Sequence, residues 1–346
     1  MKITKLLTLI FAFALLFNVS CSSEDGITTG EMYYGNGFLL SNEGNFGKPN
    51  ADVTFVSSNL ASKQDNIFSA NNGGSNLGDV LQMIAFNGDN AYLLLNNSNK
   101  IQIVNRFDFK KAGEITTQLN SPRFMAFANN NIYVTNDKYG GDKFVSIYKS
   151  SDLSFVKKIN FTDTVERIVE AGNNIFVQNA SFGFGDKITY ITTSNNEVQS
   201  TITIPNGNIN KMIVNNETVY AIAAGTSDSY IYQISATGVT KTYTLTGIAD
   251  ANNLEIENGK FYFTSGLKVY TMDLTATSAP SAPLFTVDNS VDPYSNLYGF
   301  SVVNDRIFVS DANGFTEDSK ISVYSKSGLL LRSFTAGKAT NGAYWN

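Results

Sequence analysis

The feature that most constrains the fold of this chain is a short pattern that recurs seven times. In each copy, a turn rich in Asn, Gly and acidic residues precedes an apolar dipeptide of β-forming residues. The seven dipeptides are Phe38-Leu39, Ala91-Tyr92, Ile132-Tyr133, Ile175-Phe176, Val219-Tyr220, Phe261-Tyr262 and Ile307-Phe308. Their spacings are 53, 41, 43, 44, 42 and 46 residues. A period of this length indicates a repeat architecture.

Each repeat is expected to form four short strands, and the third repeat shows them most clearly. Its strands are predicted at 124–127, 132–135, 144–148 and 155–159. The third strand recurs in the other repeats, at 53–56, 101–104, 188–191, 230–234, 269–272 and 321–324. After the first 21 residues no stretch has a convincing helical period. The pattern predicts an all-β, seven-bladed β-propeller with four-stranded blades.

The two ends of the repeat region predict how the ring closes. The first blade has no clear innermost strand before Gly37, and residues 341–346 fall where a further innermost strand would begin. We therefore predict that this C-terminal strand joins blade one and leaves no unpaired inner edge. The propeller domain is predicted to span residues 33–346.

Residues 1–20 are predicted to be a signal peptide. Lys2 and Lys5 form a basic n-region, and residues 6–17 are an almost unbroken apolar run. About 12 apolar residues are too few for a stable membrane span, which needs roughly 20.

Cys21, the only cysteine of the chain, follows directly. Residues 18–21 resemble a bacterial lipoprotein processing site, although Asn18 stands where Leu is usual. Cys21 is then the lipidated first residue and the attachment point to the membrane, and residues 21–32 are the lipidated cysteine and a polar tether. Residues 22–25 (SSED) resemble the acidic signal that exports some Bacteroidota lipoproteins. We therefore expect an outer-membrane lipoprotein that is exposed at the cell surface.

Composition excludes several classes of function. The chain contains no histidine, which rules out a Ser–His triad, a histidine general base and a His-ligated metal site. Its net charge of −5 becomes −7 when Lys2 and Lys5 are removed with the signal peptide, which argues against a nucleic-acid partner. There is no P-loop pattern, and Gly183-Phe184-Gly185 lacks the following helix of a dinucleotide site.

The loops between the second and third strands of the blades are the predicted binding elements, because their lengths vary on a constant scaffold. Long loops are expected at 42–52, 136–143, 179–187 and 311–320, each with a small polar residue at its start and an aromatic beside a glycine. The connections between blades share this face, and they include Arg123, Glu166, Arg167, Lys211, Asn252 and Tyr294. The predicted ligand-binding residues on this face are Asn42, Glu43, Asn45, Phe46, Asn136, Tyr139, Asn179, Phe182, Phe184, Arg123, Arg167, Asp311, Asn313 and Phe315. The alternative for each aromatic is that it simply caps its own blade.

Carboxylates on the same face make calcium an alternative ligand. The candidates are Glu43, Asp142, Asp186, Asp311, Glu317 and Asp318. They do not match the EF-hand spacing, and surface carboxylates in an acidic protein are usually solvated, so we predict no metal site. Nothing singles out a nucleophile or an acid/base pair. The sequence therefore predicts a protein that is not an enzyme and has no cofactor.

The segment 42–47 (NEGNFG), with Asn50 and residues 52–56, resembles the opening repeat of YncE-like seven-bladed propeller lipoproteins of Bacteroidota. Residues 297–311 and the closing segment 341–346 resemble the final blade of that family. One branch of the family captures vitamin B12 and related corrinoids and passes them to a TonB-dependent outer-membrane transporter. The resemblance implies a binder of the same kind, with a corrinoid as possible ligand and such a transporter as partner.

Two alternatives to nutrient capture remain open at this point. One is an adhesion or scaffold propeller that binds a protein or a glycan over the same face. The other is a calcium-dependent hydrolase that uses the carboxylates.

Overall fold

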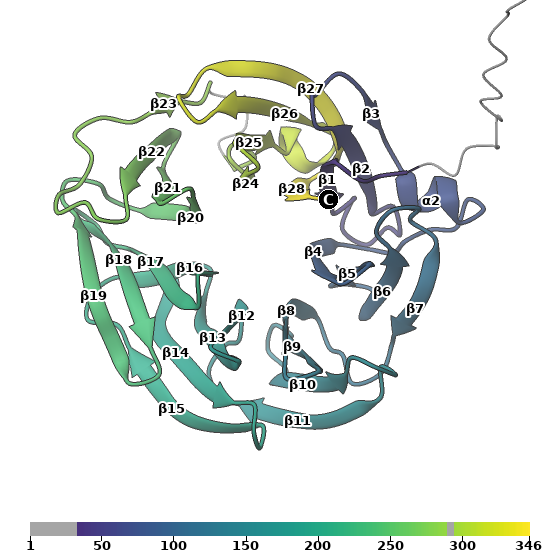
Figure 1. Cartoon of the computed structure of the whole chain (residues 1–346), viewed down its shortest axis with the longest axis horizontal. Helices are drawn as coiled ribbons and strands as arrows, with labels where there is room; N and C mark the ends of the chain where they lie inside the picture. The colour runs from purple at the N-terminus through teal and green to yellow at the C-terminus, as the bar shows by residue number, and fades with distance from the viewer. Residues whose placement is uncertain (1–32, 289–293) are drawn as a thin grey trace, which may run out of the picture. The chain divides into compact units, whose positions relative to one another are not determined.

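The computed structural model describes residues 33–288 and 294–346, and its propeller begins at Tyr34. The predicted signal peptide, Cys21 and the tether lie outside the described residues. Seven four-stranded antiparallel sheets stand around a central axis as the blades of a propeller (Figure 1). The predicted fold class is confirmed.

Every blade runs from an innermost strand at the axis to an outermost strand at the rim. From blade one to blade seven, the innermost strands are β28 (Thr340–Trp345), β4 (Leu81–Asn87), β8 (Pro122–Ala128), β12 (Ile168–Ala171), β16 (Asn208–Asn215), β20 (Ala251–Glu257) and β24 (Gly299–Val303). The second strands are β1 (Gly37–Asn42), β5 (Asn90–Leu95), β9 (Asn131–Asp137), β13 (Asn174–Ser181), β17 (Thr218–Ala224), β21 (Lys260–Ser265) and β25 (Arg306–Asp311). The third strands are β2 (Asp52–Ser57), β6 (Lys100–Asn105), β10 (Lys143–Lys149), β14 (Phe184–Thr192), β18 (Ser229–Ser235), β22 (Lys268–Asp273) and β26 (Asp318–Ser325). The outermost strands are β3 (Lys63–Gln64), β7 (Lys111–Ile115), β11 (Phe155–Phe161), β15 (Glu197–Thr203), β19 (Gly238–Leu245), β23 (Phe285–Thr286) and β27 (Leu330–Lys338).

The second strands are the most deeply buried, because each blade packs against a neighbour on both faces. All six residues of β1 are buried, and so are five of the six in β5. This packing explains why the strands carry β-branched and aromatic residues on both sides instead of alternating with polar ones. The outermost strand β11 contains no buried residue. Aromatic rings pack against one another between adjacent blades. The ring centroids of Phe38 in blade one and Phe308 in blade seven, for example, are 4.7 Å apart.

The ring closes as the sequence predicts. Strand β28 pairs antiparallel with β1, with Trp345 opposite Phe38 and Ala343 opposite Leu40. The last residue, Asn346, extends this closure beyond the strand. Its Nδ2 donates hydrogen bonds to the backbone oxygens of Tyr34 (2.6 Å) and Arg106 (2.8 Å). The hydrogen bonds of Asn346 therefore connect the two ends of the propeller to each other and to blade two.

The prediction of a long loop at 179–187 in blade four is wrong. Strand β13 continues to Ser181 and β14 begins at Phe184, so a two-residue turn replaces the loop. Phe182 (φ 51°) and Gly183 (φ 78°) both have positive φ, which is the backbone of a tight hairpin turn that matches the strand twist. The other three loops are present, since β1 and β2, β9 and β10, and β25 and β26 are separated by connecting residues.

Helix α2 (Ile67–Asn71) lies between blades one and two and was not predicted, because five residues are too short to show a helical period. It buries Ile67 and Phe68, and the carboxylate of Asp52 accepts the backbone N–H of Phe68 at 2.9 Å. The short 3₁₀ helix η1 (Asn313–Phe315) lies in the loop of blade seven. Within residues 33–288 and 294–346, no helix has the length and apolar character that crossing a bilayer requires.

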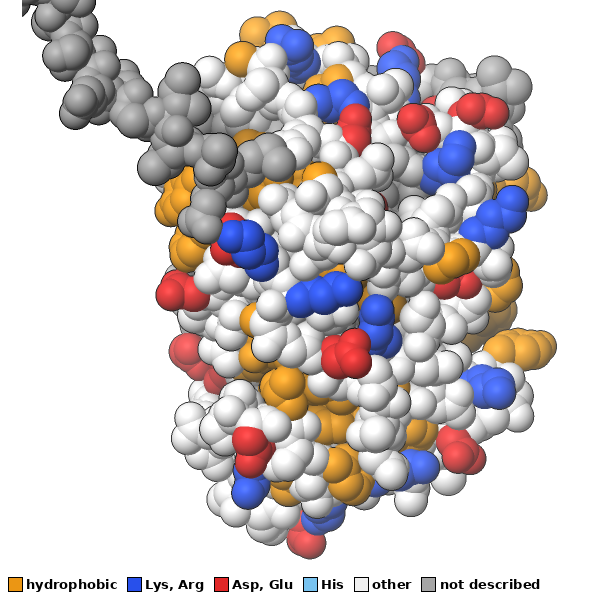
Figure 2. All heavy atoms as spheres, turned by 90° about the vertical axis from the view of Figure 1, so that its right-hand side faces the viewer, with side chains coloured by type: hydrophobic (Ala, Val, Ile, Leu, Met, Phe, Trp, Pro, Cys, Tyr) orange, Lys and Arg blue, Asp and Glu red, His pale blue; other side chains and the backbone are white. Residues whose placement is uncertain are grey.

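The rim of the propeller carries charges of both signs. On the side shown in Figure 2, Lys and Arg side chains lie among Asp and Glu side chains, with smaller apolar areas between them. This interspersed pattern is typical of a solvated surface.

Candidate functional site

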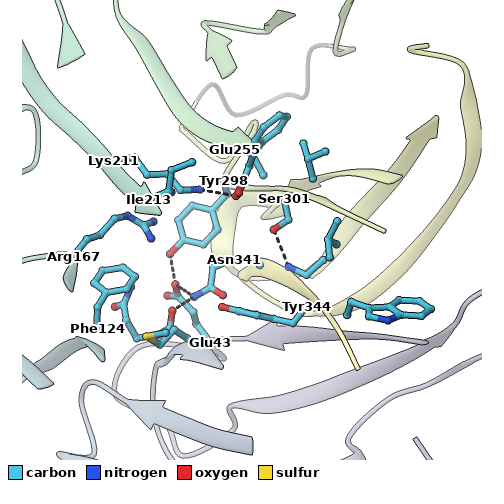
Figure 3. A pocket seen from close by; sticks show the side chains of 18 of the residues that line it. Glu43, Phe124, Arg167, Lys211, Ile213, Glu255, Tyr298, Ser301, Asn341 and Tyr344 are labelled. Atoms are coloured by element: carbon cyan, nitrogen blue, oxygen red, sulfur yellow. Dashed lines mark hydrogen bonds and ion pairs between the residues drawn. The ribbon is translucent and has the colours of Figure 1, made fainter. Parts of the chain in front are cut away.

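A cavity of about 620 Å³ lies on the axis of the ring. It is surrounded by the innermost strands and by residues that directly precede them (Figure 3). We call it the channel. Its lining residues are Glu43, Gln82, Met83, Phe86, Phe124, Arg167, Lys211, Ile213, Glu255, Tyr298, Phe300, Ser301, Val302, Val303, Asn341, Gly342, Ala343, Tyr344 and Trp345. The volume suits a small organic molecule.

Strand register explains which side chains face the channel. In every blade, the residue that pairs with the second residue of the repeated apolar dipeptide lies on the innermost strand. These residues, from blade one to blade seven, are Tyr344, Ala85, Ala126, Val169, Ile213, Glu255 and Ser301. Because side chains alternate along a strand, the residue two positions earlier faces the same way. We call this second set the cationic layer, and its members that line the channel, in blades one to five, are Gly342, Met83, Phe124, Arg167 and Lys211.

One ion pair, Lys211–Glu255, lies in the wall of the channel, and a second, Arg123–Glu166, adjoins it, with Arg123 Nη1 3.2 Å from Oε1 of the lining residue Gln82. The guanidinium of Arg123 holds the carboxylate of Glu166 in a bidentate arrangement, with Nε–Oε2 and Nη2–Oε1 distances of 2.9 and 2.7 Å. The ammonium of Lys211 lies 2.7 Å from Oε1 of Glu255. Lys211 is only 7% exposed, and burial lowers its pKa although the nearby Glu255 opposes the change. Both pairs link adjacent blades, three with four and five with six.

Arg167 differs from these two cations. Its guanidinium carbon lies 4.3 Å from the centre of the Phe124 ring, which is a cation–π arrangement. Its backbone oxygen accepts from the N–H of Gln178 at 2.8 Å, but its guanidinium forms no hydrogen bond or ion pair with the described residues. The nearby carboxylates of Glu166 and Glu255 are bound by Arg123 and Lys211. Burial lowers the pKa of Arg167, but a guanidinium keeps its proton in proteins. Figure 3 shows its side chain directed into the channel.

A hydrogen-bonded group lies where the channel meets the face that carries the variable loops. The phenol of Tyr298 and the amide of Asn341 donate to Oε1 of Glu43 at 2.8 and 2.7 Å (Figure 3). Burial raises the pKa of Glu43, and the two hydrogen bonds only partly oppose it. The ring of Phe315 meets Tyr298 edge-on at 4.9 Å, and Asn45 Nδ2 donates to the backbone oxygen of Phe315 at 3.0 Å. The loops of blades one and seven are thereby joined at the channel mouth.

The small polar residues that open the loops have partners inside the protein. Asn42, Asn136 and Asn179 are buried. Asn42 bonds to Thr54 and Thr340, Asn136 to Ser146, and Asn179 to Thr189. Asp311 accepts hydrogen bonds from Ser295 and from the backbone N–H of Asn313. These contacts shape the loops, and none of the four residues lines the channel.

The loop aromatics extend from the protein. The exposed fractions of Phe46, Tyr139, Phe182 and Phe184 are 79, 100, 87 and 77%. These four side chains do not line the channel, whereas Phe315 contributes to its mouth through Tyr298.

The carboxylates considered for calcium are dispersed. Asp142 lies 3.7 Å from Lys158 and Asp318 lies 3.8 Å from Lys338, both as surface ion pairs. Within the part of the chain that the structure describes, no three acidic or sulfur-containing side chains gather at distances suited to a metal ion.

Of the residues predicted from the sequence, Glu43 and Arg167 line the channel and Arg123 lies beside it, whereas most of the other lining residues were not among the predicted ones. Arg123 lies within β8, Lys211 within β16 and Asn252 within β20, not in the connections between blades. Glu166, Arg167 and Tyr294 do lie in connections. The missed residues include Gln82, Glu255, Tyr298, Asn341 and Tyr344. Counting along the chain from each repeated dipeptide would have found Tyr344 and Glu255 only if the register of each hairpin were known.

Comparison with known proteins agrees with this architecture. A family model described as a domain of unknown function, DUF5074, matches residues 36–328. The chain belongs to the DUF5074 family. The match ends before β28, although this strand of the DUF5074 chain completes blade one. No curated protein sequence matches the chain.

Solved structures with the same architecture are distant in sequence. A quinoprotein alcohol dehydrogenase-like protein from Bacteroides thetaiotaomicron aligns with a TM-score of 0.67 and 13% identity, over 90% of this chain and 79% of that one. A functionally unknown protein from Desulfotomaculum acetoxidans aligns with a TM-score of 0.65 and 11% identity, over 90% and 98% of the two chains. At these identities the likeness shows the fold alone.

Proposed function

We propose that this protein is a non-enzymatic surface lipoprotein that captures a small nutrient molecule at the channel and passes it to a TonB-dependent transporter. The observation that carries the proposal is the channel itself. It combines a volume of about 620 Å³ with aromatic walls and convergent charged groups at one end. Ligand sites are typically concave and largely apolar, with a few placed polar groups.

The position of the first propeller residue is consistent with surface attachment. The backbone N–H of Tyr34 donates to Phe107, in the turn between β6 and β7 of blade two. This turn lies on the face opposite the variable loops, because antiparallel strands reverse direction at each connection. Tyr34, where the propeller begins, therefore lies on the face opposite the channel mouth.

A corrinoid is the ligand suggested by the resemblance to YncE-like lipoproteins. A corrinoid is too large to enter the channel whole, so its periphery would rest on Phe46, Tyr139 and Phe315 above the mouth. Without histidine in the chain, no imidazole would coordinate the cobalt.

The test is a calorimetric titration with cobalamin, together with mass spectrometry of small molecules that co-purify with the protein from its natural host. Ile213→Trp places a large ring in the channel, and the adjacent Val214→Trp is a matched control because Val214 is exposed and does not line the channel. Capture predicts a ligand that is lost in Ile213→Trp and retained in Val214→Trp. Equal ligand content in both variants would contradict it, and lack of cobalamin binding at high micromolar concentration would exclude the corrinoid.

The second candidate function is adhesion or scaffolding, and the exposed aromatics Phe46, Tyr139, Phe182 and Phe184 favour it. Large aromatic side chains at loop tips are common anchors in protein interfaces. A pull-down from outer membranes with a variant that carries alanine at these four positions separates the two functions. Loss of a protein partner with unchanged small-molecule content would favour scaffolding.

A further inference from the structure

Among the described residues that line the channel, Arg167 is a cation whose guanidinium forms no ion pair at hydrogen-bond distance. Arg123 and Lys211 each bind a carboxylate at hydrogen-bond distance, and they occupy the two acidic groups nearest to Arg167. A charged group inside a protein is costly unless it is paired and hydrogen-bonded. The five N–H donors of the Arg167 guanidinium can therefore form strong hydrogen bonds with a molecule that enters the channel.

The side chain of Arg167 is restricted by an aromatic neighbour. Its guanidinium carbon lies 4.3 Å from the centre of the Phe124 ring, a contact that restricts the group and leaves its N–H edges available to a ligand. Such an edge suits two parallel hydrogen bonds to a carboxylate or a phosphate. Lys211 occupies the equivalent position in the next blade, where it is paired with Glu255 at 2.7 Å.

Space for the rest of the ligand lies across the ring. The cationic layer has Arg167 and Lys211 in blades four and five, but a glycine, Gly342, in blade one. Blades four and five lie opposite blade one in a ring of seven. A Cβ at position 342 would come within 3.0 Å of the Tyr344 hydroxyl, so a larger residue there would reduce this space. Toward the other end of the channel the walls are apolar, with Phe86, Val303 and Trp345.

Building on the proposed capture function, we propose that Arg167 is the anion-recognition point of the channel, and that the ligand is a small organic molecule with a carboxylate or phosphate group on an apolar body. The acidic group pairs with the Arg167 guanidinium, and the apolar part extends across Gly342 toward Phe86 and Trp345. Arg123 stays paired with Glu166 and Lys211 with Glu255 when the ligand binds. These two ion pairs contribute to the electrostatic potential around the site.

The experiment uses three simple probes of similar shape with the full chain: benzoate, phenyl phosphate and the neutral benzamide. Calorimetric titration is expected to show 1:1 binding of the two anions at least about tenfold tighter than that of benzamide, because charge-assisted bidentate hydrogen bonds are strong. Comparison of benzoate with phenyl phosphate shows which acidic group the site prefers. Competition by inorganic phosphate tests whether the anion alone accounts for the binding.

Three variants test the residue. Arg167→Met removes the charge and the donors but keeps a long apolar side chain on Phe124, and should abolish the preference for anions. Arg167→Lys keeps the positive charge but loses the planar guanidinium and its parallel N–H donors. It should weaken the binding of benzoate, but the two anions should still bind more tightly than benzamide. Arg332→Gln, at an exposed position of β27, is the control and should leave binding unchanged. The apo Tm of Arg167→Met should equal or exceed that of the unmodified protein, because the substitution removes an unpaired charge from the interior.

Each contrary outcome has a distinct meaning. Equal binding of benzoate and benzamide, or full benzoate binding by Arg167→Met, would overturn the role of Arg167 but leave a channel that holds small molecules. A natural ligand without an acidic group would do the same. Absence of binding by all three probes at 10 mM would contradict the anion site, whereas the cobalamin titration and the ligand content of Ile213→Trp test the capture function separately. A large fall in apo Tm for Arg167→Met would show that the guanidinium is structural.

Discussion

Replacing Asn346 by alanine tests whether the side chain of this residue stabilises the closed ring. Its side chain donates to the backbone oxygens of Tyr34 at 2.6 Å and Arg106 at 2.8 Å, and its Oδ1 accepts from Nε of Arg106 at 2.6 Å. The side chain is buried, and its three bonds join blade one to blade two and to the first residue of the propeller. Alanine keeps the backbone bond from the N–H of residue 346 to Gly37 and removes all three others.

The expected cost follows from these three bonds. Two neutral hydrogen bonds contribute about 1 kcal/mol each, and one to a charged guanidinium contributes about 2 kcal/mol. Arg106 is only half-buried, so water can replace part of its lost bond. We expect the free energy of unfolding to fall by about 3 kcal/mol, which corresponds to roughly 6 °C in Tm for a domain of this size.

The assay is urea denaturation at fixed pH, with the midpoint compared at constant m-value. Asn195→Ala is a matched control, because Asn195 is exposed in a turn of blade four and should change stability by less than about 0.5 kcal/mol. The double variant Asn346→Ala/Arg106→Met should lose less than the sum of the two single losses, since the residues share a bond. Arg106→Met also removes the stacking of the guanidinium on Phe86 at 4.0 Å.

A loss below about 1 kcal/mol for Asn346→Ala would refute this reasoning. It would mean that the strand pairing of β28 with β1 closes the ring without help from the last side chain. Strict additivity in the double variant would equally contradict a shared bond.

Further predictions concern closure, pH and attachment. Deletion of residues 341–346 removes most of β28 and should abolish cooperative unfolding or lower Tm by well over 10 °C, because it exposes the inner edge of β1; an unchanged Tm would count against closure by this strand. Burial raises the folded pKa of Glu43 above 4.5, so the folded protein holds this proton more tightly than the unfolded chain, and the free energy of unfolding should fall as pH rises from about 4.5 through the raised value. Glu43→Gln keeps an oxygen acceptor for Tyr298 and Asn341 and should flatten this slope in urea midpoints measured from pH 4 to 8; an unaltered slope would assign it to other groups. Cys21→Ala should abolish labelling by radioactive palmitate and release the protein from the membrane fraction, and labelling that persists would exclude Cys21 as the lipidation site.

The repeat could be predicted because it rests on local signals. Each first hairpin needs a turn of Asn and Gly followed by apolar β-forming residues, and both parts are visible in the sequence. Asn258 (φ 49°) and Gly259 (φ 75°) adopt the positive φ that such turns require. Seven copies at nearly constant spacing then leave few architectures other than a propeller.

The channel could be predicted only in part. Glu43, Arg123 and Arg167 were found because they lie near the ends of strands on the loop face. The ion pairs were not visible, since Arg123 and Glu166 are 43 residues apart and Lys211 and Glu255 are 44 apart. Each separation is one repeat, so these pairs form only when neighbouring blades stand side by side.

Irregular strand pairing also makes the residues that line the channel difficult to predict from the sequence. The innermost strands contain register shifts, between Leu81 and Met83 in β4 and between Ile209 and Lys211 in β16. A shift of one residue turns every following side chain to the opposite face of the strand. Whether Lys211 faces the channel or the blade interior therefore depends on a bulge that the sequence does not reveal.

By itself, the sequence determined the number of blades, the strands within each blade and the strand that closes the ring, because turn propensity and apolar periodicity act over a few residues. The tertiary structure alone decided that Arg123 and Lys211 are neutralised while Arg167 is not. Charge compensation depends on distances across blades of about 3 Å, and such distances exist only after the ring has closed and set the register of seven innermost strands.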